Sequence, residues 1–329
     1  MKKSLVALAA LAVVGAASAQ SSVTLYGVVD AALFDSNAVG VNAQMSGSGL
    51  MNNGTSRFGF RGTEDLGDGL KAGFNIEGGF NPETGVGNTS GGNLFSRAAN
   101  LSLSGNFGSV RLGRGLTPSF YGVAVWELTG TANYSVVSNQ FGFAGADARN
   151  SSEFSYTTPS MGGFSATLGY VAKDDNLVGA TPGTFTPAGV FVPAVTGVAA
   201  SKTDANVLYV NGPIAVGLSY NKVQGFERGL ALGAKYNFGT FALAGSLQDP
   251  AGVKKGFTIG GTANLGPVAL TLDLARDTGS AIMNTDTLLE AKYALSKRTF
   301  AYAAALRDGS AVATVPSVTS YSLGIRHNF

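Results

Sequence analysis

The chain has 329 residues, of which 22 are Lys or Arg and 20 are Asp or Glu, so that only 13% are charged. Soluble domains carry about 25% charged residues. The chain holds 47 glycines but only 10 prolines, and 45% of its residues are hydrophobic, which excludes collagen-like and acidic disordered proteins. It has no cysteine and a single histidine. Disulfide scaffolds, thiolate metal sites, cysteine nucleophiles and histidine clusters are therefore excluded.

Residues 1–19 have the pattern of a secretory signal peptide. Two lysines precede a short apolar stretch, and an A-x-A cleavage sequence ends at Ala19. The apolar stretch is shorter than the roughly 20 residues that a membrane-spanning helix needs. We therefore expect an exported mature chain, 20–329, in which basic and acidic residues are equal in number. A chain without net charge has no bulk attraction for nucleic acid, and we expect no nucleic-acid partner.

The mature chain is dominated by alternation of apolar with small or polar residues. Within 163–170, aromatic and aliphatic residues take every second position, with Ser, Thr and Gly between them, as a pleated strand requires. Such runs last about ten residues, which matches a tilted strand that crosses a bilayer and exceeds the usual soluble strand. We expect sixteen strands, at 22–33, 55–63, 70–80, 95–105, 109–114, 151–158, 163–173, 205–211, 213–223, 228–238, 240–248, 255–265, 267–277, 285–295, 298–308 and 318–329.

The connections between these segments alternate between short and long. Glycine-containing turns such as Gly212 and Gly239 are short, whereas the long connections fall at 34–54, 81–94, 115–150, 174–204 and 309–317. A closed antiparallel barrel with one turned end and one looped end has this asymmetry. The sequence therefore predicts an all-β fold, a sixteen-stranded antiparallel transmembrane β-barrel. Sixteen strands enclose too wide an interior for side chains to fill, so we expect a water-filled lumen.

Four stretches carry a resemblance to a known family. They are 22–27 (SVTLYG), 56–67 (SRFGFRGTEDLG), 103–108 (LSGNFG) taken with 112–114 (LGR), and the terminal strand 321–329 (YSLGIRHNF). The chain resembles general diffusion porins of the outer membrane, in their β-proteobacterial, neisserial-type branch. The resemblance extends over the mature chain, although 174–204 contains no residues typical of the family.

The resemblance implies several properties beyond the barrel itself. It implies a homotrimer in the outer membrane of a Gram-negative bacterium, in contact with its lipids and lipopolysaccharide and without cofactor or metal. The terminal Phe329 would be the sorting signal for the barrel assembly machinery. The third extracellular loop, 115–150, would fold into the lumen as an eyelet. The loop lacks the Pro-Glu-Phe-type motif of enteric porins, so only its position carries over.

Alternation assigns the charged residues to one face of the wall. Phe58 and Phe60 occupy lipid-facing positions, which places Arg57 and Arg61 in the lumen. An arginine on the lipid face near the bilayer midplane would cost roughly 2–4 kcal/mol. The same argument places Arg149 and Glu153 inside.

The family resemblance adds a candidate pore constriction. Arg57, Arg97 and Arg149 resemble the basic cluster that faces acidic eyelet residues in anion-preferring members, and Glu127 and Asp147 are the acidic candidates here. Arg61 and Glu153 complete the candidate set. Such a cluster would attract small anions, because low-dielectric walls concentrate the field of grouped charges.

An alternative interpretation stays open for these arginines. They would then pair with Glu64, Glu77 or Glu153 as salt bridges within the wall. Arg97 raises a separate difficulty, because strict alternation turns it toward lipid; facing the lumen requires a bulge or an irregular strand start. Aromatic residues of the loop, Trp126 among them, are expected to anchor it to the wall.

These observations predict a general porin for passive diffusion of small hydrophilic solutes and ions, with a mild anion preference. The alternatives are a substrate-selective channel and a surface adhesin or phage-receptor barrel, which long loops would allow. An enzyme is not expected. His327 lies on the outward side of the last strand and no G-x-S-x-G sequence occurs, so a nucleophile–base pair has no candidate.

Overall fold

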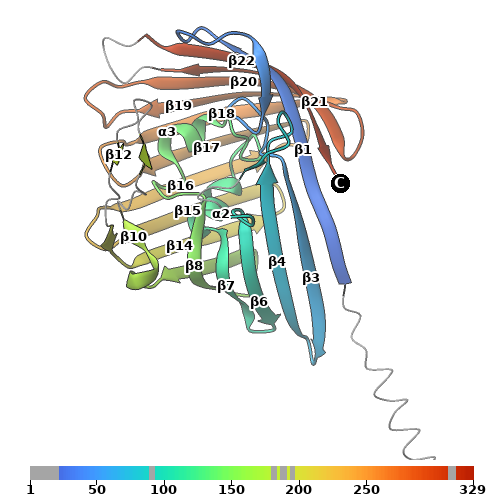
Figure 1. The fold of residues 1–329 in the computed structure, drawn as a ribbon, viewed down its shortest axis with the longest axis vertical. Helices are drawn as coiled ribbons and strands as arrows, with labels where there is room; N and C mark the ends of the chain where they lie inside the picture. Colours follow the sequence, from blue (N-terminus) through green and yellow to red (C-terminus); the bar gives the residue numbers. More distant parts are fainter. Residues whose placement is uncertain (1–21, 89–92, 179–183, 186–190, 193–196, 310–315) are drawn as a thin grey trace, which may run out of the picture.

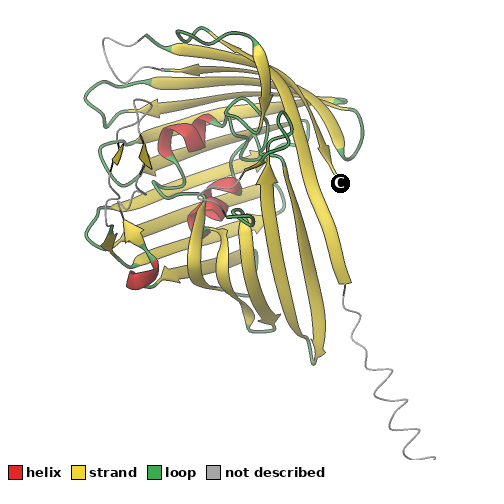
Figure 2. Ribbon diagram, viewed as in Figure 1, coloured by secondary structure: helices red, strands yellow, loops and turns green. Residues whose placement is uncertain are grey.

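The structure is a computed structural model that describes residues 22–88, 93–178, 184–185, 191–192, 197–309 and 316–329. The expected signal peptide and parts of the long connections lie outside these residues. Figures 1 and 2 show a wall of long strands that curves around two short helices. Among the described residues, no helix has the length and apolarity needed to cross a bilayer.

Sixteen long antiparallel strands form the wall, as the alternation predicts. They are β1 (Ser22–Ser36), β3 (Arg57–Gly67), β4 (Leu70–Phe80), β6 (Ala98–Gly105), β7 (Gly108–Leu116), β8 (Arg149–Thr157), β9 (Phe164–Val171), β14 (Lys202–Asn211), β15 (Ile214–Val223), β16 (Arg228–Asn237), β17 (Phe241–Asp249), β18 (Gly256–Leu265), β19 (Val268–Asp277), β20 (Thr285–Ala294), β21 (Thr299–Asp308) and β22 (Val318–Asn328).

The long connections contain the remaining elements. These are the short strands β2 (Gln44–Gly47), β5 (Gly87–Asn88), β10 (Leu177–Val178), β11 (Thr184–Phe185), β12 (Phe191–Val192) and β13 (Val198–Ala199), and the helices α2 (Pro118–Ala124), α3 (Val136–Phe141) and the 3₁₀ turn η2 (Lys173–Asp175). Both α-helices belong to the connection between β7 and β8.

The first and last strands close the barrel. β1 pairs with β3 on one side and with β22 on the other, where the register runs from Val28 opposite Asn328 to Ser36 opposite Ser320. Beyond this ladder, the backbone amides of Gly27 and Phe329 each donate to the other's carbonyl oxygen at 3.0 Å. Within the described strands of the wall, no sheet edge is left open to hydrocarbon, where each unpaired backbone group would cost several kcal/mol.

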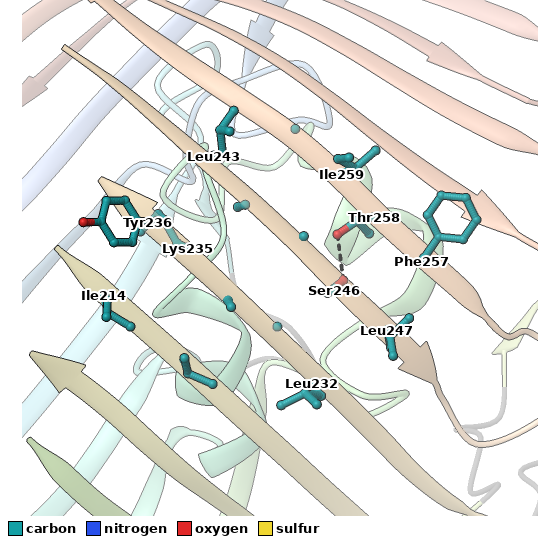
Figure 3. Close-up of a pocket in the computed structure, with 16 residues that line it drawn as sticks. Ile214, Leu232, Lys235, Tyr236, Leu243, Ser246, Leu247, Phe257, Thr258 and Ile259 are labelled. Atoms are coloured by element: carbon teal, nitrogen blue, oxygen red, sulfur yellow. Dashed lines mark hydrogen bonds between the residues drawn. The ribbon is translucent and has the colours of Figure 1, made fainter. Parts of the chain in front are cut away.

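The outward face of the wall is apolar. Leu232, Leu243 and Ile259 are each about half exposed, at 46%, 52% and 58%, as lipid-facing side chains are in an isolated barrel. These side chains, drawn in Figure 3, line a hollow of about 870 Å³ on β15–β18, together with the paired residues Ala234 and Gly245. Its apolar lining suits hydrocarbon chains rather than an aqueous solute.

Four strand ends differ from the expected bounds by three residues or more. β1 continues to Ser36, β14 begins at Lys202, and the other two are in β6 and β3. The strand expected at 95–105 begins at Ala98, directly after Arg97, whose amide still donates to the Glu77 carbonyl oxygen at 3.1 Å. The strand expected at 55–63 continues to Gly67 through a register shift after Asp65. A bulge of this kind lets a strand run on while its twist increases.

Gly27 provides a test of barrel closure. A Cβ at this position would lie 2.3 Å from Cζ of Phe329 and 2.5 Å from the carbonyl oxygen of Arg57. We expect Gly27→Ala to lower the temperature at which the barrel loses its compact, heat-modifiable gel mobility. Gly245→Ala is the matched control, because its Cβ would meet only the Thr258 carbonyl oxygen at 3.4 Å. Equal stability of the two variants would contradict the expectation.

Candidate functional site

Residues 117–148, here called the lumen segment, connect β7 to β8 and lie against the inward side chains of distant strands. Helix α2 contacts β14, β15 and β16, whereas α3 contacts β19 and β20. Thr117 caps α2 by accepting a hydrogen bond from the Phe120 amide at 3.0 Å, and Pro118 takes the first turn, where a missing N–H costs nothing. Ser119 then donates from both its amide and its hydroxyl to Asp204 on β14, each at 2.7 Å.

Two aromatic residues hold the lumen segment to the wall, as the sequence predicts for Trp126. Trp126 is 1% exposed and its indole occupies the space that a side chain at Gly233 would fill. Tyr134 is fully buried and donates to Glu290 at 2.6 Å. Burial, and then the negative charge of Glu290, raise the pKa of Tyr134, so its hydroxyl remains a donor.

Glu127 has no open face toward the lumen. It is 3% exposed and accepts hydrogen bonds from the Thr129 hydroxyl at 2.5 Å, the Thr131 amide at 2.6 Å and the Ser135 hydroxyl at 2.7 Å. The carboxylate holds the turn between α2 and α3 together. The sequence led us to expect Glu127 to face the arginines across the lumen. In the structure its carboxylate is instead bonded to residues 129–135, because the chain bends back around it.

Three arginines gather around one carboxylate on the opposite side of the barrel. Nε of Arg97 lies 2.6 Å and Nε of Arg57 3.6 Å from the Glu77 carboxylate. Nε of Arg149 donates to the backbone carbonyl of Arg97 at 2.9 Å. We call Arg57, Arg97 and Arg149 the arginine cluster. The structure thus brings these three candidates together, and the salt-bridge alternative with Glu77 applies to two of them.

Arg97 and Arg149 reach the arginine cluster through irregular backbone. Arg97 precedes the first residue of β6, so the alternation of side chains along that strand does not determine which way Arg97 points. Ser152 has a φ of 51° and the β7–β8 register shifts nearby. This bulge interrupts the alternation on which the placement of Arg149 relied, and Arg149 enters from the start of β8 instead.

Asp147 lies beside the arginines rather than across from them. It lines a cavity of about 410 Å³ together with Arg97, Arg114 and Arg149. The Arg114 side chain donates to the Ser96 carbonyl and to the Ser151 hydroxyl. The sequence assigned Arg114 no role in the pore, because its position at the base of the lumen segment depends on the bulge.

Glu153 is part of the wall. Its side chain is fully buried and accepts from Arg111 and from Asn150, each at 2.6 Å. Glu153 therefore corresponds to the salt-bridge alternative, with Arg111 as its partner.

Arg61 lies apart from the arginine cluster. It is four residues along β3 from Arg57, toward the short turn that follows Gly67, and four residues span roughly 13 Å of strand. Its guanidinium carbon sits 5.0 Å from the centre of the Tyr26 ring.

The sequence missed an inward fold of the first long connection. Asp30 on β1 is fully buried and accepts from Asn52 at 2.8 Å, from the Gly54 amide at 3.0 Å and from Tyr302 at 2.6 Å. The residues around 49–55 are thereby held inside the barrel. The only hint in the sequence is an Asn-Asn-Gly run, which is equally typical of an exposed turn.

This inward turn links the lumen segment to the last strand of the wall. Asn53 donates to the Tyr134 hydroxyl at 2.8 Å and accepts from Arg326 of the last strand at 2.8 Å. It therefore connects the lumen segment to β22. Among the residues that the structure describes, no cluster of His, Asp or Glu could hold a metal ion.

A family model described as Gram-negative porin matches residues 5–310. The chain belongs to the Gram-negative porin family. This porin is 41% identical over 261 residues to outer membrane porin protein 32 of Delftia acidovorans, with 75% of this chain and 69% of the relative covered. It is 39% identical over 119 residues to the major outer membrane protein P.IB of Neisseria meningitidis serogroup B, covering 35% of this chain and 34% of that protein.

Solved structures agree with the fold. The anion-selective porin from Comamonas acidovorans superposes with a TM-score of 0.72 at 32% identity, covering 94% of this chain and all of that one. A mutant of the Rh. blastica porin superposes with a TM-score of 0.66 at 16% identity, covering 94% of this chain and all of that chain. The resemblance to neisserial-type outer-membrane porins is confirmed. This porin is an outer-membrane protein, and its family indicates a channel rather than an enzyme.

Proposed function

We propose that this porin is a passive diffusion channel for small hydrophilic solutes that prefers anions, and that the arginine cluster sets the preference. The supporting observation is the imbalance of charge around Glu77, whose single carboxylate pairs with Arg57 and Arg97, while Arg149 lies beside them and donates to the Arg97 carbonyl oxygen. The anion selectivity named for the similar Comamonas acidovorans structure agrees with this proposal. It involves no catalytic step and no cofactor.

The arginines suit this role because they are neither fully neutralised nor sealed from water. The side chains of Arg57 and Arg97 are 22% and 16% exposed. Grouped guanidiniums between low-dielectric walls raise the local concentration of anions and reject cations. The lumen segment adds no opposing carboxylate at Glu127, whose oxygens are engaged within the loop.

Reversal potentials in a potassium chloride gradient test the proposal. The wild type should favour chloride, and Arg57→Gln with Arg149→Gln should lower the chloride-to-potassium permeability ratio. A unit charge at contact distance contributes about 1 kcal/mol even in water, so we expect a change of at least about fivefold. Arg298→Gln, an exposed charge in the turn before β21, should leave the ratio unchanged. An unaltered ratio in the double variant would refute the assignment.

We also propose that this porin assembles as a homotrimer in contact with outer-membrane lipids and lipopolysaccharide. The apolar outward face supports lipid contact. The terminal Phe329, paired with Gly27 at the barrel seam, is proposed as the contact for the barrel assembly machinery. The bilayer recordings report the oligomer directly, because a trimer that inserts as a unit raises the conductance in groups of three equal steps.

A further inference from the structure

We propose that Arg61 forms a second anion-binding station, separate from the arginine cluster, for small organic anions that carry hydroxyl groups. The station rests on the proposed function only in that anions must enter the lumen to reach it. It lies toward the end of the barrel with short turns, which in outer-membrane barrels is the periplasmic end.

The strand register places the station in two rows across four neighbouring strands. The first row is Thr24, Arg61, Asn75 and Asn100, each opposite the next on β1, β3, β4 and β6. The second row, one step nearer the short turns, is Ser22, Thr63, Gly73 and Ser102. All eight positions share the inward face, because side chains two residues apart point the same way.

Glycine at position 73 opens the space between the two rows. These residues line a cavity of about 360 Å³, which is large enough for a small organic anion. A Cβ at Gly73 would lie 2.8 Å from the Ser102 hydroxyl oxygen. Any side chain at position 73 would therefore fill the part of the cavity between the two rows.

Tyr26 holds the Arg61 side chain in place from the other side. The Tyr26 ring lies against Gly59, where a Cβ would approach its hydroxyl to 2.8 Å. The Tyr26 hydroxyl shares its one proton between Oδ1 of Asn75 at 2.8 Å and the Glu77 carboxylate at 3.0 Å. With the ring fixed at its hydroxyl end, the guanidinium stacked on it at 5.0 Å is preorganised.

Arg61 has no acidic partner within the described residues. The salt bridges there engage Arg57, Arg97 and Arg111 but leave Arg61 out. Its contact is the uncharged face of a ring. The hydrogen-bond donors of the Arg61 guanidinium therefore remain available to a ligand.

The chemistry of the lining selects the ligand class. A fixed guanidinium offers two parallel N–H donors to a carboxylate or another oxyanion. The hydroxyls of Thr24, Thr63 and Ser102 and the amide of Asn100 complement hydroxyl groups, because each can donate and accept. A hydroxylated carboxylate meets both requirements, whereas an aliphatic carboxylate meets only the first.

Inhibition of chloride current by gluconate tests the station. Gluconate and hexanoate have six carbons and one carboxylate each, but only gluconate carries hydroxyls. In the wild type, gluconate should inhibit at lower concentration than hexanoate. Arg61→Gln should raise the half-inhibitory gluconate concentration about tenfold, because the loss of one charge-assisted hydrogen bond weakens binding by about that factor. Arg61→Lys should restore only part of it, because lysine lacks the paired donors.

Two further variants separate the station from its surroundings. Thr63→Val keeps the shape of the side chain and removes the hydroxyl, so it should reduce the difference between gluconate and hexanoate. Arg298→Gln should change neither value. If Arg61→Gln is inhibited by gluconate as strongly as the wild type, the station is refuted. That result leaves the reversal potentials of the Arg57 and Arg149 variant unaffected, so failure of the station and failure of the proposed function are distinguishable.

Discussion

Replacing Glu77 by glutamine should strengthen the anion preference of this porin, opposite in sign to neutralising the arginines. Glu77 is the carboxylate that Arg57 and Arg97 share, and it accepts a further hydrogen bond from Tyr26. Glutamine preserves the shape and can still accept from Tyr26, but it removes the negative charge. One charge at contact distance corresponds to about 1 kcal/mol in water and about 4 kcal/mol near a protein surface. The chloride-to-potassium permeability ratio should therefore rise at least about fivefold.

Glu64→Gln is the control for this prediction. Glu64 lies on the same β3–β4 hairpin opposite Ala72, at an outward, exposed position, so its removal changes the net charge equally without altering the lumen. The permeability ratio should stay at the wild-type value. A fall of the ratio in Glu77→Gln would show that the carboxylate acts by positioning the guanidiniums, and would contradict a purely electrostatic account.

Releasing the lumen segment should produce the largest change in conductance. Trp126→Ala removes a fully buried indole that packs against Gly233, and such truncations cost about 3–5 kcal/mol. Without the indole, the segment between α2 and α3 should leave its place against β16. We expect a wider distribution of single-channel conductance with a higher mean, and a lower melting temperature of the detergent-solubilised barrel.

A second variant reaches the same packing from the wall. Gly233→Ala would place a Cβ 2.2 Å from Cε2 of Trp126, so it should displace the indole without creating a cavity. Gly245→Ala, on the neighbouring strand with its Cβ clear of the lumen segment, is the control. Wild-type conductance in both Trp126→Ala and Gly233→Ala would mean that the rest of the segment suffices to hold it.

The regular parts of this porin could be predicted from the sequence because one physical constraint governs them. A strand between lipid and water must alternate, so the faces of Phe58 and Arg57 were determined by the cost of exposing charge to hydrocarbon. The same constraint accounts for all sixteen strands. It does not act where the chain leaves the ladder.

The residues whose positions the sequence did not predict lie where the chain leaves the strands. Glu127 could not be placed, because its surroundings depend on how Thr131 and Ser135 fold back within the lumen segment. The inward turn near Asn52 depends on Asp30 and Tyr302, which are far apart in the sequence. These contacts come from tertiary structure, and local composition carries no sign of them.

The surplus of guanidinium groups around Glu77 has a consequence for transport itself. Arg57, Arg97 and Arg149, with Arg114 beside them, outnumber the carboxylates of Glu77 and Asp147. Electroneutrality then requires mobile counter-ions to reside there continuously. A newly arriving ion displaces a resident one, so the rate of passage depends on how weakly each occupant is held and not only on the width of the opening.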